Sequence, residues 1–402
     1  MTSNPVNIYE YEELAKERLS QGDYDFIAGA ATDEITLRRT RAVFDSIMMR
    51  PRMMVDISNR DMSTTVLGQG ISFPVMLDPA GNHGAANPEA ELATARAAGA
   101  AGTLMVLSSQ STRTLEEVAQ VATGPIWFQQ YFFKDRGLTL EMARRAEEAG
   151  YTALCLTVDA KVKPKRERNI RNNYVGPVSP NYAKLGLSTH SSQFGLDAPA
   201  GPMDIRDQAA TWSDLDWLAA NTNLPLVMKG IMAGEDGKQC AEHGAKAVIV
   251  SNHGARYLDT TFATIEVLPE VVEAVDGQIE VYMDGGIRRG SDVFKSLALG
   301  ARAVLIGRPL FWGLAVDGEA GLRAVLEMLR DELDGTMGMC GRPTIGSIDV
   351  GSLSSVSPLL AMFPQHTDYR QSKPRICCLQ WSSFRRLRWN WLPPGNCDPG
   401  TG

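Results

Sequence analysis

The sequence predicts an α/β fold, namely a single (β/α)8 TIM barrel with an N-terminal helical segment and a long loop after strand 4. Three observations predict it. Eight short apolar runs recur from residue 73 onward, polar or glycine residues end each run, and a helix-like segment follows. Near-continuous apolar runs are typical of parallel strands that are buried on both faces. Eight alternations favour a closed barrel over the alternative, an open doubly wound sheet.

Residues 1–70 are expected to form the helical segment, which packs on the barrel. The stretch IYEYEELAKERL (8–19) suits a surface helix, and further helical stretches are expected near residues 24–31 and 36–44. The chain then becomes irregular up to the first apolar run.

The barrel is expected over residues 71–364. Its strands are predicted at FPVMLDP (73–79), TLMVLSS (103–109), IWFQQYF (126–132), ALCLTVD (153–159), LPLVMKG (224–230), AVIVSNHG (247–254), IEVYMDGG (279–286) and AVLIGRP (303–309). Gly150, Gly244 and Gly300 are expected to end the intervening helices, because glycine supplies the left-handed residue that stops a helix. Ser213 with Asp216, and Ser291, are expected to cap the helices that follow them.

Two segments depart from this pattern. The connection between Asp159 and Leu224 holds more than sixty residues rich in Asn, Ser, Gly, Pro and Lys. Such a long loop is usually functional or mobile, and its position after the fourth strand places it over the catalytic face. Residues 365–402 have no helical or strand period and are expected to be a disordered tail; contact of this basic, aromatic tail with a membrane or nucleic acid is the alternative.

The composition restricts the class of protein. A content of 44% hydrophobic and 22% charged residues is ordinary for a soluble globular protein, and a net charge of −7 argues against nucleic acid as a partner. The six cysteines include no CxxC pair, so neither a disulfide framework nor a metal site is expected. The polar N-terminus and the lack of a long apolar run predict a cytoplasmic protein without a membrane span.

Polar side chains gather where the predicted strands end, and in barrels of this class the active site lies at those ends. They are Asp78, Ser108, Gln129, Tyr131, Thr157, Asp159, Lys229, Ser251, His253, Arg256, Asp284, Arg288 and Arg308. A scaffold alone does not require such a set. We therefore expect these residues to surround one opening.

The last two strand ends predict a phosphate site. DGGIRRG (284–290) and GRP (307–309) bring glycines and arginines to the loops after strands seven and eight, the usual phosphate position of these barrels. Glycine lets backbone N–H groups approach an anion, and arginine offers two parallel donors. Glycine also serves plain turns, which is the alternative here.

The segment SNHGARYLD (251–259) carries the most specific signal. Histidine exchanges a proton near neutral pH, and Arg256 can hold an anion beside it. A lone histidine is more often structural, but Asp159 is available to stabilise an imidazolium. We therefore expect His253 to be a catalytic base.

With these residues in view, the sequence resembles the FMN-dependent α-hydroxy-acid oxidases and dehydrogenases, the family of glycolate oxidase, lactate oxidase and mandelate dehydrogenase. The resemblance spans about residues 8–363. It rests on TARAAGAAGTLMVLSS (94–109), LTVD (156–159), LPLVMKG (224–230), SNHGARYLD (251–259) and DGGIRRGSDVFKSLALGARAVLIGRP (284–309).

The resemblance implies oxidation of a 2-hydroxy acid to a 2-oxo acid, with electrons passed to oxygen or another acceptor. His253 would take the substrate proton and Asp159 would support its charged form. Substrate would be held by Arg256, Arg166 and Tyr131. Lys229 would stabilise charge on the reduced flavin. A homo-oligomer, tetramer or octamer, is also implied.

The same resemblance implies an FMN site. Pro79, Ala80 and Gly81 would pack against the flavin ring. The remaining cofactor contacts would come from Ser108, Gln129, Thr157, Lys229, Ser251, Asp284, Gly285, Gly286, Ile287, Arg288, Gly307 and Arg308.

Three departures from the family bear on the substrate. Phe26 stands where relatives have a tyrosine that binds the substrate carboxylate, and Gln110 stands where many have an aromatic residue. AKVKPKR (160–166) replaces the usual segment before the substrate arginine. A flavin enzyme of the same fold acting on a modified peptide, an alcohol or an amine is therefore the alternative. A non-catalytic flavin-binding protein would be expected to lack His253 or Lys229, and this chain has both.

Overall fold

The structure is a computed structural model that describes residues 5–176, 179–185 and 205–354. The chain divides into two units, Met1–Ala361 and Met362–Gly402, and the second lies wholly outside the described residues. The predicted tail, 365–402, therefore lies outside them too. Within the described ranges no helix combines the length and the apolar character needed to cross a bilayer.

The predicted closed barrel is confirmed. Parallel strands follow one another in chain order, and β10 pairs with β3 to close the ring, with Val304 opposite Val75. The strands are β3 (Val75–Leu77), β4 (Met105–Ser108), β5 (Ile126–Gln130), β6 (Leu154–Thr157), β7 (Leu226–Ile231), β8 (Ala247–Val250), β9 (Glu280–Asp284) and β10 (Ala303–Ile306). Each coincides with one of the eight apolar runs, and only β7 extends beyond its run, by the single residue Ile231.

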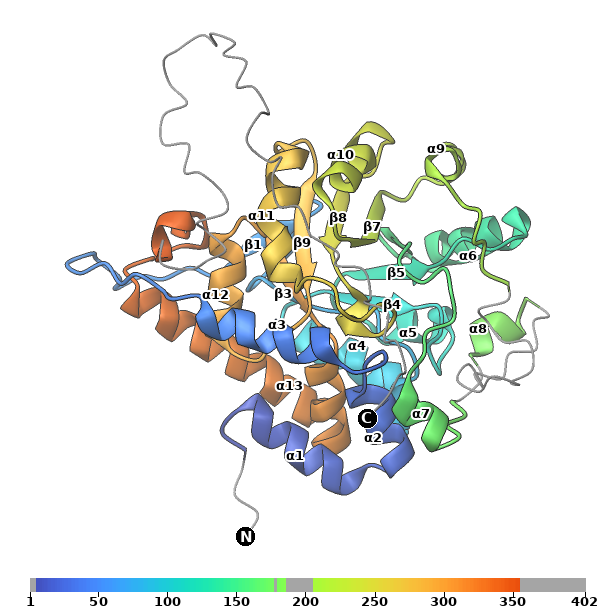
Figure 1. Cartoon of the computed structure of the whole chain (residues 1–402), viewed down its shortest axis with the longest axis horizontal. Coiled ribbons are helices and arrows are strands. Elements are labelled where there is room, and N and C mark those ends of the chain that lie inside the picture. The colour runs from blue at the N-terminus through green and yellow to red at the C-terminus, as the bar shows by residue number, and fades with distance from the viewer. Residues whose placement is uncertain (1–4, 177–178, 186–204, 355–402) are drawn as a thin grey trace, which may run out of the picture. The chain divides into compact units, whose positions relative to one another are not determined.

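A helix follows every strand (Figure 1). These helices are α4 (Ala90–Ala100), α5 (Leu115–Val121), α6 (Arg136–Glu148), α9 (Trp212–Asn221), α10 (Gly234–Glu242), α11 (Thr264–Val275), α12 (Gly290–Ala298) and α13 (Arg308–Met339). Gly150, Gly244 and Gly300 follow α6, α10 and α12 with φ of +88°, +83° and +103°, so the predicted helix stops are confirmed. Helix α13 is interrupted at Asp317 and Gly318.

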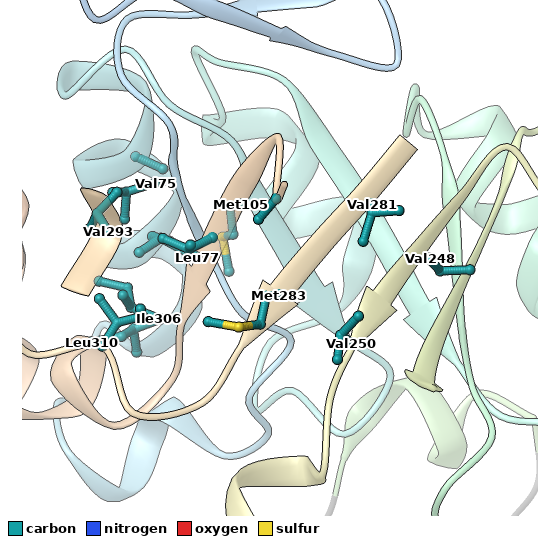
Figure 2. Close-up of a cluster of buried hydrophobic side chains, with 14 of the residues drawn as sticks. Val75, Leu77, Met105, Val248, Val250, Val281, Met283, Val293, Ile306 and Leu310 are labelled. Atoms are coloured by element: carbon teal, nitrogen blue, oxygen red, sulfur yellow. The ribbon is translucent and has the colours of Figure 1, made fainter. Parts of the chain in front are cut away.

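The strands are buried on both faces, which explains their continuous apolar sequence. Alternate residues such as Met76 and Leu305 fill the barrel interior. Their neighbours, including Val75, Leu77 and Ile306, pack outward against the helices, and Figure 2 shows this outer layer. The core thus has two concentric layers, and the rigid strands hold their carboxyl ends in fixed positions.

The N-terminal helices are α1 (Ile8–Arg18), α2 (Gln21–Ala28) and α3 (Ile35–Ser46), close to the predicted ranges. Figure 1 shows α1 alongside α13, and α2 contacts α7 (Glu167–Arg171) in the long connection. An antiparallel hairpin, β1 (Thr64–Val66) with β2 (Gln69–Ile71), follows and was not predicted. Its Val66 and Ile71 join the interior cluster and close the barrel at the amino ends of the strands.

Two predicted helix caps are wrong. Helix α9 is preceded by Thr211, whose N–H donates to Asp214 at 2.8 Å, whereas Asp216 contacts His243 Nδ1. Helix α12 begins at Gly290, and the carboxylate of Asp292 accepts from the backbone N–H groups before it. In both cases the helix begins two residues earlier than expected, and an aspartate of its first turn accepts from the backbone N–H of the residue before the helix.

Candidate active site

A cavity opens at the carboxyl ends of the barrel strands and collects most of the predicted site residues. Its lining includes Phe26, Pro79, Ala80, Gly81, Ser108, Gln110, Tyr131, Arg166, Lys229, His253, Arg256, Asp284, Gly285, Gly286, Ile287, Arg288, Gly307 and Arg308. The other four predicted residues do not line the cavity but bind residues that do, directly or through one another. Gln129 accepts from Ser108 and donates to Thr157, Asp159 contacts His253, and Ser251 accepts from Lys229. The site residues predicted from the sequence therefore lie close together in the structure.

His253 lies on a tight turn directly after β8. His253, Gly254 and Ala255 all have positive φ, of +57°, +63° and +62°. Such a run of left-handed residues is strained for residues other than glycine, and strain of this kind clusters at functional sites. The turn is tied at its far end by Asp259, which accepts from the backbone N–H groups of Ile35 and Thr36 at the start of α3.

Asp159 orients the imidazole of His253. Its Oδ1 lies 2.8 Å from His253 Nδ1, which leaves Nε2 as the nitrogen that can exchange a proton with a substrate. Gly230 makes this approach possible: it has a φ of +105°, and a Cβ there would lie 2.7 Å from Asp159 Cβ. The dyad thus depends on a glycine at the end of β7.

The protonation states suit a base. Burial lowers the pKa of His253, and Asp159 only partly offsets this effect, so the imidazole is neutral at pH 7. Burial raises the pKa of Asp159, but His253 and then Lys229 lower it more, so the carboxylate stays ionised. An unprotonated imidazole beside a carboxylate can accept a proton and stabilise the resulting charge.

Lys229 projects from β7 between two carboxylates. Its Nζ lies 2.5 Å from Asp284 Oδ2 and 3.6 Å from Asp78 Oδ1, and it donates to Ser251 Oγ at 2.9 Å. Burial raises the pKa of Asp78 to about 7, although Lys229 acts in the opposite direction. Asp78 was recognised in the sequence only as a polar residue at a strand end, and it brings a second titratable group to the site.

Arginines form a cationic wall that is anchored on α2. Arg256 Nη1 donates to the carbonyls of Ile27 and Gly29 at 3.2 and 3.1 Å, and Arg308 donates to the same two carbonyls. Arg166 Nε donates to the carbonyl of Arg256 at 3.1 Å. The carbonyls at the end of α2 therefore hold two guanidinium groups at the cavity.

This wall suits an anion such as a phosphate. Among the described residues, no carboxylate lies within 4.0 Å of a guanidinium nitrogen of Arg256, Arg288 or Arg308. Burial, followed by repulsion from Arg288, lowers the pKa of Arg308 to about 10. Because these charges repel one another and none has a direct ion-pair partner among the described residues, an anion between them would be stabilising.

The cavity lining also contains Phe26 and Gln110, the two residues that were expected to be unusual. The ring of Phe26 stacks on Tyr174 at 4.7 Å between centroids, and Arg256 Cζ lies 5.1 Å from its centroid. Gln110 fills the space beside Gly81, where an added Cβ would lie 3.0 Å from Gln110 Cβ. Because Gly81 has no side chain, it leaves space both for Gln110 and for a ligand in the cavity.

Sequence reasoning missed several lining residues. Tyr182 comes from α8 (Pro180–Ala183) in the long connection, and its hydroxyl lies 3.0 Å from Ser109 Oγ. Tyr257 packs on His253 with centroids 4.5 Å apart. The position of Tyr257 within SNHGARYLD could have identified it from the sequence. The connection around Tyr182 has no periodicity from which its position could be predicted.

Known proteins resemble this chain along most of its length. The profile of the FMN-dependent dehydrogenase family matches residues 15–355. An L-lactate oxidase from Nostoc sp. is 49% identical over 364 residues, covering 87% of this chain and 98% of that protein. Glycolate oxidase 3 from Arabidopsis thaliana is 47% identical over 342 residues, covering 84% and 92%.

Solved structures agree with the fold. A crystal structure of mandelate oxidase superposes with a TM-score of 0.80 at 35% identity, covering 87% of this chain and 98% of that one. An active chimera of (S)-mandelate dehydrogenase superposes with a TM-score of 0.81 at 37% identity, covering 87% and 99%.

Proposed function

The chain belongs to the FMN-dependent dehydrogenase family and oxidises 2-hydroxy acids with FMN, and we propose that His253 is the base and that Arg256 and Arg166 hold the substrate carboxylate. The observation that carries this assignment is the His253–Asp159 pair, at 2.8 Å, beside arginines in one cavity. The substrate loses two electrons and two protons overall. FMN, when bound, accepts the electrons.

Each polar side chain then has a defined task. Arg256 and Arg166 orient the carboxylate, Tyr131 donates a hydrogen bond to the substrate, and Nε2 of His253 accepts a proton. The ion pair with His253 lets Asp159 favour the protonated imidazole that results. Lys229 would supply positive charge beside the bound flavin.

The proposed FMN site uses both ends of the cavity. Pro79, Ala80 and Gly81 would face the ring, with Ser108, Gln129, Thr157 and Ser251 supplying or supporting polar contacts. Asp284, Gly285, Gly286, Ile287, Arg288, Gly307 and Arg308 would hold the ribityl chain and phosphate. The cationic wall described above supports this orientation, since a phosphate there would meet Arg288 and Arg308, which have no carboxylate within 4.0 Å in the described part of the chain.

We propose a small 2-hydroxy acid of the lactate or glycolate type as substrate, in line with the names of the similar enzymes. The arginines beside His253 favour a free carboxylate over a modified peptide, an alcohol or an amine. Cytoplasmic location and homo-oligomeric assembly remain predictions; a rice relative is described as peroxisomal.

An anaerobic titration tests the proposed function. Glycolate, lactate, mandelate and longer-chain acids are added to the flavin-loaded protein, and the visible flavin band is followed. We expect at least one acid to bleach it, and readmitted air then shows whether oxygen reoxidises the flavin. A yellow protein that no 2-hydroxy acid bleaches would contradict the assignment.

The pH dependence of flavin reduction should report His253. Because burial holds its pKa below 6.5, the base is unprotonated above that value and is lost as the pH falls through it. We expect the second-order rate of reduction to be flat from about pH 7 to 8 and to fall about tenfold per unit in acid. Stopped-flow absorbance measures it, and a rate that rises in acid would refute the assignment.

Asp78 provides the control for this profile, since its pKa of about 7 lies in the same range. The variant Asp78→Asn removes any inflection that belongs to the carboxyl group. The acid limb that remains in this variant then belongs to His253.

The variant Phe26→Tyr should bind a small hydroxy acid more tightly. The new hydroxyl would lie on a ring that already lines the cavity near Arg256, and one hydrogen bond to a charged acceptor contributes about 1.5–3 kcal/mol. We expect the apparent dissociation constant for glycolate, measured from anaerobic reduction rates, to fall by about 10-fold or more. An unchanged constant would show that position 26 does not face the carboxylate.

A further inference from the structure

Arg206 has no role in the reaction proposed above. It lies at the end of the long connection, pairs with Phe133 through a single β-bridge, and is 2% exposed. Its Nη1 donates to the carbonyl of Ala160 at 3.3 Å and to Tyr257 Oη at 3.0 Å. Its Cζ lies 3.4 Å from the ring centroid of Tyr131, so the guanidinium stacks behind a wall of the active-site cavity.

Arg206 has no direct ion-pair partner among the described residues. Within the described ranges no acid lies within 4.0 Å of it, and its Nε and Nη2 have no hydrogen-bond partner. By contrast, the buried Arg145, which is 8% exposed, contacts Glu116 at 2.9 Å. A guanidinium keeps its proton in proteins, and a buried ion without a counter-charge is strongly unfavourable.

Arg206 is also one of the residues around a second cavity of about 320 Å³. Arg206, Thr157, Met228, Trp212 and Leu215 line it, and Tyr131 lines both this cavity and the active-site cavity. Two acids also border it, but Asp207 is bound by Arg136 at 2.5 Å and Asp236 is exposed. The second cavity therefore offers a largely apolar wall with one buried cation.

We propose that Arg206 and this cavity form a subsite for the carboxylate of a small organic acid. Two sources share this chemistry. One is the distal carboxylate of a dicarboxylic 2-hydroxy acid whose first carboxylate is held by Arg256 and Arg166, and this source rests on the proposed function. The other is a separate carboxylate molecule that binds beside the active site, against the far face of Tyr131.

The test compares 2-hydroxybutanoate with 2-hydroxysuccinate, which have the same chain length but differ in the distal carboxylate. Arg206→Gln removes the charge and Arg206→Lys retains it. Arg302→Gln is the matched control, because Arg302 binds Thr65 at the opposite end of the barrel. Flavin reduction with each acid gives a ratio of kcat/KM, and succinate, which has no hydroxyl to oxidise, is added in thermal unfolding.

The first outcome is that the substrate supplies the carboxylate. In that case Arg206→Gln lowers the ratio of kcat/KM for 2-hydroxysuccinate to kcat/KM for 2-hydroxybutanoate by about 10- to 100-fold, and Arg206→Lys retains part of the wild-type ratio. If a separate molecule supplies it, the ratio stays constant, whereas succinate raises the unfolding temperature of the wild type and not of Arg206→Gln. Either result supports the subsite. Arg302→Gln should behave as the wild type in both assays.

The proposal is overturned if neither the ratio nor the succinate-dependent shift changes in Arg206→Gln. Bleaching of the flavin by 2-hydroxybutanoate in the same experiment would show that the proposed function stands without it. If no acid bleaches the wild type, the proposed function fails, and the succinate shift still tests the subsite. Should Arg206→Gln not fold, the absence of a succinate shift in the wild type, together with no preference for the dicarboxylic acid, would overturn the proposal.

Discussion

Replacing His253 with glutamine will slow anaerobic flavin reduction by about 10²- to 10⁴-fold while FMN stays bound. Glutamine matches the size of the imidazole and can still contact Asp159, but it cannot accept a proton. The loss therefore falls on the chemical step rather than on cofactor binding. Stopped-flow absorbance measures the rate, and the flavin-to-protein absorbance ratio measures cofactor content.

The chain supplies a matched control in His243. Its Nδ1 lies 2.8 Å from Asp216, the same separation as in the His253–Asp159 pair, but it is partly exposed at the residue directly after α10, where its ring stacks on Trp212. His243→Gln should leave the rate unchanged. A His253→Gln variant that reduces its flavin as fast as the His243→Gln variant would exclude His253 as the base.

Replacing Lys229 with methionine will lower the free energy of unfolding by about 3–5 kcal/mol. The lysine is 3% exposed and lies between the partly buried Asp78 and the buried Asp284, so its loss leaves two carboxylates without their cation. Chemical denaturation at pH 8, above the pKa of about 7 of Asp78, measures the effect. The loss of unfolding free energy should become smaller as the pH falls through the pKa of Asp78, because a protonated, neutral carboxyl is not destabilised by the absence of the lysine charge.

Lys295 is the control for this prediction. It is also buried, at 8% exposure, but its Nζ donates to the carbonyl of Phe44 and, among the described residues, has no acid within 4.0 Å. Lys295→Met removes a buried charge without stranding a carboxylate at that distance, so we expect a smaller loss. Equal losses in the two variants, or a Lys229→Met loss that grows in acid, would contradict this account.

The sequence predicted the barrel because its signals are local and repeated. Each strand is a short apolar run, and glycines such as Gly150 and Gly300 stop helices through their own backbone conformation. The position of His253 followed from the same argument, since parallel strands in a barrel share one carboxyl end.

The remaining features depend on contacts that leave no periodic trace. The β1 and β2 strands have three residues each, too few to alternate visibly. Tyr182 and Arg206 belong to the long connection, where only folding decides which side chains turn inward. The anchoring of Arg256 and Arg308 uses backbone carbonyls of α2, and a carbonyl has no signature in a sequence.

That anchoring also sets an order of events during synthesis. Ile27 accepts from Arg256, 229 residues later, and from Arg308, 281 residues later. At about 5–20 residues per second, helix α2 emerges from the ribosome roughly 10–60 s before its last partner. Contacts with such long sequence separation form late in folding. The pocket is therefore completed only after all eight barrel strands have been synthesised. A nascent chain released before Arg308 would carry His253 without the complete cationic wall.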